Sequence, residues 1–211
     1  MVRIHPESQF IAPFFFTFRL SSIFTTTMMR ETPNSNDENL TTYQLAIEKL
    51  AKLKSEEIFS NEGPEHAAFV MGNIFINAQS KVRIFAGDFN GDVSNNAYYI
   101  DGLQKFLNKN CSNLTVIFEK SPNTNSTAYK ILTSPKFHKK VELRILGNEI
   151  DSKAPFHFAV GDSNMFRIET DTEKYTAICS FNNQENSEKL IKHFDEFLLD
   201  KSSIIAKQTT N

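Results

Sequence analysis

The most informative part of the sequence for the fold is FHFAVGDSNMFRIE, residues 156–169. Its two halves, Phe156–Val160 and Met165–Ile168, have the apolar pattern and short length that are typical of β-strands. The polar turn Asp162-Ser163-Asn164 between them is short enough to predict a hairpin. A further strand is predicted over Tyr175–Phe181. We therefore expect the second half of the chain to supply consecutive short strands.

A helix is predicted directly after these strands, over Asn186–Leu199. Its apolar residues recur at a spacing that places them along one side of a helix. They are Leu190, Ile191, Phe194, Phe197 and Leu198. We therefore expect this helix to cover one face of the sheet.

The first half of the chain alternates between helical and strand patterns. Strands are predicted over Lys81–Ala86, Leu114–Phe118 and Val141–Leu146, and helices over Leu40–Leu53, residues 64–78, Asn95–Leu107 and Ser126–Leu132. Helical connections between successive strands are typical of parallel pairing. The expected fold is therefore α/β, with a mixed, mostly parallel sheet that is flanked by helices.

One domain over residues 37–200 fits the length of 211 residues. Residues 1–36 are expected to be a leader, either disordered, a targeting segment, or the product of a start codon placed before Met28 or Met29. Residues 201–211 are polar and predict a flexible tail.

The composition excludes several classes of protein. The net charge is −2, which disfavours non-specific electrostatic binding to nucleic acid or anionic lipid. Cys111 and Cys179 are too few for a disulfide framework or a four-cysteine zinc site. No apolar run is long enough to span a bilayer, and no glycine-rich phosphate loop is present. We expect a cytoplasmic protein that binds no membrane, no metal and no cofactor.

The segment 82–198 resembles one half of a phospholipase D superfamily enzyme, chiefly through residues 156–169 and the run YTAICSFNNQENSEKLIKHFDEFL at 175–198. In that superfamily one strand carries His-x-Lys-x4-Asp, and the next strand carries Gly-Ser-x-Asn. The resemblance implies the fold of the superfamily. It also implies pairing of two halves or two copies, because the enzymes need two motifs.

The chain departs from the catalytic residues of that superfamily. If Asp162 stands at the motif Asp, His157 stands at the Lys position and Pro155 at the His position. Proline has no nucleophilic nitrogen, so the phosphohistidine step of the family is excluded there. Residues 166–169, Phe-Arg-Ile-Glu, replace Gly-Ser-x-Asn.

Four polar residues on the predicted hairpin form the first candidate site: His157, Asp162, Arg167 and Glu169. Arg167 and Glu169 are two residues apart on a strand, so they share a face. They predict either a structural ion pair or a replacement polar site in which Arg167 binds a phosphate or carboxylate.

The loop AGDFNGD, residues 86–92, follows the first predicted strand of the parallel part. Loops at the carboxyl ends of parallel strands bind ligands in α/β proteins, so Asp88 and Asn90 are candidate ligand-binding residues. The alternating Asp88, Asn90 and Asp92 resemble the start of a calcium loop, but the later ligands are missing.

The basic cluster Lys136, Lys139 and Lys140 is the candidate nucleic-acid contact, and a solvated loop is the other interpretation. Taken together, the sequence predicts a non-catalytic binding or regulatory module, such as an accessory protein of a prokaryotic stress or defence system. The alternatives are a phosphodiesterase or nuclease with a rebuilt site at His157, and a nucleic-acid-binding adaptor. Expected partners are a protein or a second copy, bound through the helix Leu40–Leu53, with a phosphate-bearing ligand or nucleic acid as alternatives.

Overall fold

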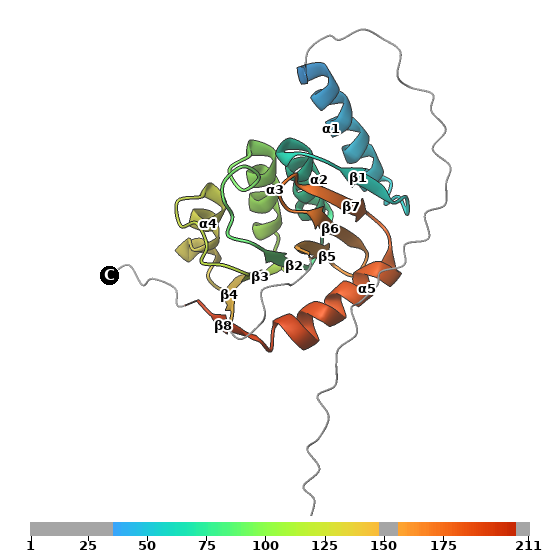
Figure 1. Ribbon diagram of the computed structural model, residues 1–211. Coiled ribbons are helices and arrows are strands. Elements are labelled where there is room, and N and C mark those ends of the chain that lie inside the picture. Colours follow the sequence, from blue (N-terminus) through green and yellow to red (C-terminus); the bar gives the residue numbers. More distant parts are fainter. Residues whose placement is uncertain (1–35, 148–155, 206–211) are drawn as a thin grey trace, which may run out of the picture. The chain divides into compact units, whose positions relative to one another are not determined.

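The computed structural model describes residues 36–147 and 156–205 (Figure 1). The helices are α1 (Asn36–Lys52), α2 (Pro64–Asn77), α3 (Ala97–Leu107), α4 (Thr127–Leu132) and α5 (Gln184–His193), and α5 continues into a π-helical turn, Phe194–Leu198. The strands are β1 (Phe59–Asn61), β2 (Lys81–Ala86), β3 (Asn113–Phe118), β4 (Val141–Leu146), β5 (Phe158–Gly161), β6 (Met165–Asp171), β7 (Thr176–Ser180) and β8 (Ser202–Ile204).

The strands form one mixed sheet in the order β1-β7-β6-β5-β2-β3-β4-β8. Only β2 with β3 and β3 with β4 pair in parallel, and every other neighbouring pair is antiparallel. The mixed sheet is confirmed, but the expectation of a mostly parallel one is wrong. The turns that join β5, β6 and β7 are too short for a crossover, so these strands can pair only antiparallel to one another.

Helices cover both faces of the sheet. In Figure 1, α2 and α3 lie on one side of the strands and α5 lies on the other. Val82 and Ile84 of β2 belong to the core that includes α2 and α3. Arg83, which alternates with them, makes a bidentate ion pair with Asp195 in the π-helical turn. Because successive side chains of β2 point to opposite faces of the sheet, this strand contacts the helical layers on both faces.

Side chains at the helix ends explain where several elements begin and stop. Pro64 occupies the first turn of α2, where a missing N–H costs nothing. Asn96, Ser126 and Asn183 cap α3, α4 and α5 by accepting hydrogen bonds from backbone N–H groups. Helix α1 begins at Asn36, four residues before the start expected from the sequence.

Two strands were not predicted. Both β1 and β8 have three residues, which is too short for an alternating pattern to stand out. Strand β8 pairs with β4 inside the segment that we expected to be a tail. Expectations for residues 1–35, Pro155 and residues 206–211 lie outside the described part of the chain. Among the described helices, none has the length and apolar character needed to cross a membrane.

Candidate functional site

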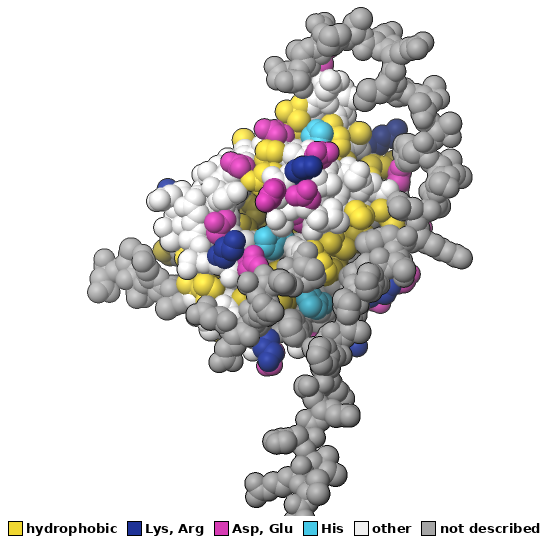
Figure 2. Space-filling model, viewed as in Figure 1, with side chains coloured by type: hydrophobic (Ala, Val, Ile, Leu, Met, Phe, Trp, Pro, Cys, Tyr) yellow, Lys and Arg dark blue, Asp and Glu magenta, His cyan; other side chains and the backbone are white. Residues whose placement is uncertain are grey.

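A cleft of about 340 Å³ opens at the sheet edge where β2 and β3 end and β5 begins. Its walls come from β2, β5 and β6, from α2 and α3, from the loops after β2 and β3, and from the turn between β6 and β7. In Figure 2, a hollow with a hydrophobic floor lies among acidic side chains, with a histidine and a basic side chain nearby. The polar lining residues are Asp88, Asn90, Ser94, Glu119, Lys120, His157, Arg167, Glu169, Thr172 and Tyr175.

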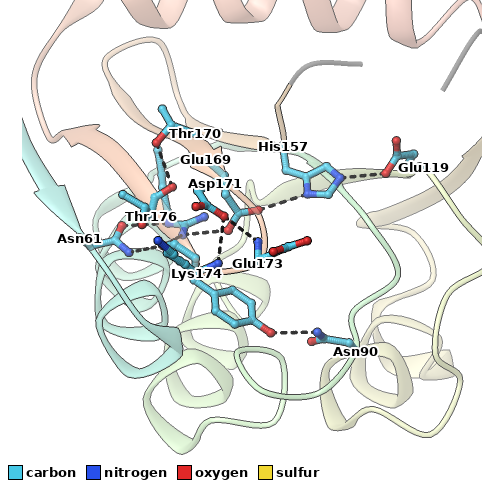
Figure 3. A network of polar contacts seen from close by, with 12 residues as sticks. Asn61, Asn90, Glu119, His157, Glu169, Thr170, Asp171, Glu173, Lys174 and Thr176 are labelled. Carbon is cyan, nitrogen blue, oxygen red and sulfur yellow. Dashed lines mark hydrogen bonds and ion pairs between the residues drawn. The ribbon is translucent and has the colours of Figure 1, made fainter. Parts of the chain in front are cut away.

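His157 lies between two carboxylates (Figure 3). Its Nδ1 is 3.2 Å from Glu169 Oε2, and its Nε2 is 3.1 Å from Glu119 Oε2. Glu119 directly follows β3, so the imidazole joins the parallel part of the sheet to the hairpin β5–β6. Gly87 makes room for the ring, because a Cβ there would lie 3.3 Å from His157 Cε1.

The two carboxylates favour the charged form of His157. Burial lowers the pKa of His157, but the hydrogen bonds and charges of Glu169 and Glu119 outweigh burial and raise the pKa above its usual 6.5. An imidazolium donates through both nitrogens, whereas a neutral imidazole has only one N–H. A carboxylate at each ring nitrogen is therefore the arrangement that favours the protonated ring.

Arg167 and Glu169 form the buried part of the same network. Arg167 Nη2 is 3.1 Å from Glu169 Oε1 and donates to the Tyr175 carbonyl at 3.0 Å. Its Nε donates to Asn61 Oδ1 at 3.2 Å. The ion pair expected from the sequence is present. These bonds make Arg167 a support for the cleft wall, because a buried charge needs its partners satisfied.

Tyr175 closes one side of the cleft by linking two loops. Its hydroxyl donates to Asp92 Oδ2 at 2.7 Å and accepts from Asn90 Nδ2 at 2.9 Å. Tyr175 and Phe89, which also lines the cleft, have left-handed backbones with φ of 55° and 59°. Such a conformation costs a non-glycine residue about 1–2 kcal/mol, so the surrounding contacts hold both aromatic residues in place.

The structure brings together five of the residues named from the sequence: His157, Arg167, Glu169, Asp88 and Asn90. Their role as a site stays a prediction. Asp162 does not join them, because it sits in the turn at the far end of the hairpin β5–β6.

The side chain of Asp162 instead binds backbone N–H groups. Its carboxylate accepts from the N–H groups of Gln79, Ser80 and Lys81 at 2.7–3.0 Å. Burial raises the pKa of Asp162, but these hydrogen bonds outweigh it and lower the pKa below its usual value. The residue therefore fastens the start of β2 to the hairpin.

The basic cluster is not a single patch of free lysines. Lys140 Nζ donates to the carbonyls of Leu107 and Lys109 at the end of α3, at 2.9 and 2.5 Å. The Lys136 ammonium lies 4.8 Å from the centre of the Phe137 ring. Lys140 therefore acts as a helix cap, which leaves Lys136 and Lys139 as candidates for nucleic-acid contacts.

Sequence reasoning missed Glu119, Tyr175 and Asn61. Glu119 could have been predicted, because it directly follows a predicted parallel strand and residues at such positions line ligand sites. The local sequence pattern did not predict that Tyr175 and Asn61 belong to the site. The left-handed turn conformation of Tyr175 and the three-residue strand β1 that holds Asn61 both leave no recognisable pattern. Within the described residues, no group of three His, Cys, Asp or Glu side chains is placed to hold a metal ion.

Comparison with known proteins gives likenesses in structure. The sequence matches no protein-family model and no curated protein. NucT from Helicobacter pylori has 11% identity and a TM-score of 0.52, and the match covers 71% of this chain and 100% of NucT. The chain therefore shares the fold of NucT.

TrmBL2, an archaeal chromatin protein with a novel mode of DNA binding, shares this fold. It has 18% identity and a TM-score of 0.52, over 80% of this chain. This chain spans 63% of the length of TrmBL2. A phosphatidylserine synthase from Haemophilus influenzae has 11% identity and a TM-score of 0.46, over 71% of this chain and 39% of the synthase.

Proposed function

We propose that this chain is a non-catalytic phospholipase D-like binding module whose ligand occupies the cleft beside His157. The observation that carries the proposal is the placement of His157 between Glu119 and Glu169. A nucleophilic histidine needs a free lone pair that faces the substrate. In the protonated ring neither nitrogen has one, and in the neutral ring both nitrogens still face carboxylates.

The same carboxylates oppose a phosphodiester substrate. A phosphate group beside His157 would approach Glu119 and Glu169, and like charges close together are unfavourable in a partly buried site. Arg167, the cation expected to bind phosphate, is bound to Glu169, Asn61 and the Tyr175 carbonyl. These contacts count against the phosphodiesterase or nuclease alternative.

The test is incubation of the full chain with bis(p-nitrophenyl) phosphate and with labelled single- and double-stranded DNA and RNA. We expect no product above the level of the His157→Ala variant. Cleavage by the wild type that is lost in His157→Ala would overturn the proposal and establish a rebuilt catalytic site.

Nucleic-acid binding is the second candidate, favoured by the DNA binding of TrmBL2. It rests on Lys136 and Lys139, since Lys140 is engaged in the protein. A salt-sensitive gel shift that is lost in the double variant Lys136→Gln, Lys139→Gln would support this candidate. The matched control is Lys105→Gln and Lys189→Gln, which removes two charges from ion pairs elsewhere.

A further inference from the structure

Apart from His157, the charged side chains of the cleft carry an excess of negative charge. Among the described residues, the cleft lining includes the carboxylates of Asp88, Glu119 and Glu169 and two fixed cations, Lys120 and Arg167. Arg167 is already paired with Glu169, and Lys120 is exposed to solvent, where its charge is screened. Without the proton on His157, the lining therefore carries more carboxylates than cations, and that proton offsets the excess.

The cleft also has an apolar floor. Met71, Ile84, Phe85, Phe89, Val93 and Tyr99 line it. The Phe85 ring meets His157 edge to face at 5.6 Å, and Phe89 meets Tyr99 in the same manner at 6.4 Å. Aromatic faces attract cations as well as apolar groups. The volume of about 340 Å³ lies at the lower end of the range for small-molecule sites.

We propose that the cleft binds a small organic cation, with an ammonium group at the Glu119 carboxylate and an apolar body on the aromatic floor. This inference rests on the proposed binding function and names its ligand class. Glu119 has His157 as its hydrogen-bond donor among the described residues. Its carboxylate has further acceptor positions that an ammonium group with three N–H donors can fill.

Charge balance couples this binding to the proton on His157. The imidazole faces Glu119 after β3 and Glu169 on β6. The other charged groups of the cleft lining are Asp88 after β2, Lys120 after β3 and Arg167 on β6. A bound ammonium group supplies the positive charge that otherwise comes from the imidazolium. The cation and the proton therefore compete, so binding releases protons at any pH where His157 is protonated in the free protein.

The experiment compares benzylamine, benzyl alcohol and benzoate, which share a ring and differ in charge. Isothermal titration of the full-length protein is expected to show millimolar or tighter binding of benzylamine, with weaker or absent binding of the other two. This comparison needs only the wild-type protein. Benzoate or benzyl alcohol binding as tightly as benzylamine, or no binding of benzylamine, would overturn the inference.

Two glutamate variants test whether the cation binds at Glu119. Glu119→Gln removes the charge but keeps the shape, and we expect it to weaken benzylamine binding about tenfold or more. Glu188→Gln makes the same change on α5, outside the cleft, and we expect it to bind as the wild type does. Equal affinity in both variants would contradict the assignment to Glu119.

Proton release supplies an independent readout. Titrations in two buffers of different ionisation enthalpy are expected to show proton release by the wild type and none by His157→Gln. Buffer-independent heats, or proton uptake, would contradict the coupling. Binding of benzoate alone would reject the cation but keep the binding module, whereas phosphodiester cleavage would reject the module itself.

Discussion

His157 is the residue whose charge connects the stability of the fold to the cleft. Its folded-state pKa is raised, so folding favours the protonated form. The extra stability is fully present below the unfolded pKa of about 6.5 and is lost as the pH rises through the folded pKa. We expect the wild type to exceed His157→Gln by about 1–2 kcal/mol in urea unfolding at pH 6, with a smaller difference at pH 9.

Glu119→Gln serves as the matched control for that measurement. It removes one of the two carboxylates that hold the imidazolium, so its unfolding free energy should depend less on pH than that of the wild type. A difference between wild type and His157→Gln that grows as the pH rises would contradict the assignment of a protonated His157.

Residue patterns could predict part of this network and not the rest. Arg167 and Glu169 follow from alternation along one strand, because the period of two is a local property. The contact between His157 and Glu119 does not, because β2 separates β5 from β3 and their relative register depends on both pairings. The Arg167–Glu169 ion pair was one of the two interpretations of the sequence, whereas the hydrogen bonds of Asp162 to backbone N–H groups were not expected.

At the level of elements, the close approach of α2 and α3 depends on two glycines. A Cβ on Gly102 would lie 2.6 Å from the Gly72 carbonyl oxygen, and neither backbone can yield without moving a helix. We expect Gly102→Ala to destabilise the protein by about 1–3 kcal/mol in chemical denaturation. Helix propensity alone would stabilise it by up to about 1 kcal/mol, so the sign of the change is decisive.

The control for this change lies on the same helix. Gln104 is exposed on α3, and Gln104→Ala should alter the unfolding free energy by no more than about 0.5 kcal/mol. A Gly102→Ala variant as stable as the wild type would show that the two helices have room to separate.

Elements were predictable where their pattern is long. Strands β2 and β4 have six residues each, and their bounds agree with the sequence expectation. Whether strands pair in parallel or antiparallel was harder to predict, because the pattern of one strand does not show which strand lies beside it. Strand β5 follows β4 in the chain but pairs with β2 and β6, which places the antiparallel hairpin beside the parallel strands.

For the whole molecule, α1 leaves hydrophobic side chains without cover. Ile47 and Ala51 are buried, and Tyr43 packs on the same core, where its ring stacks on His66 at 3.7 Å. Leu45, by contrast, is 60% exposed, and Leu53 in the turn after α1 is 67% exposed. These two leucines are the surface through which we expect α1 to contact a second copy.

Burial of these leucines across a two-fold axis would give each copy the same contacts, which is the commonest arrangement of homodimers. We expect light scattering of the full chain to give twice the monomer mass of 24.1 kDa. Leu45→Lys should halve that mass, because a charge would replace an apolar contact at the interface. Ile204→Lys makes a similar change at a residue of β8 that is 64% exposed, and it should leave the mass unaltered. A wild-type protein that remains monomeric would contradict the prediction, and it would leave the cleft, which lies within one copy, as the place to seek the ligand.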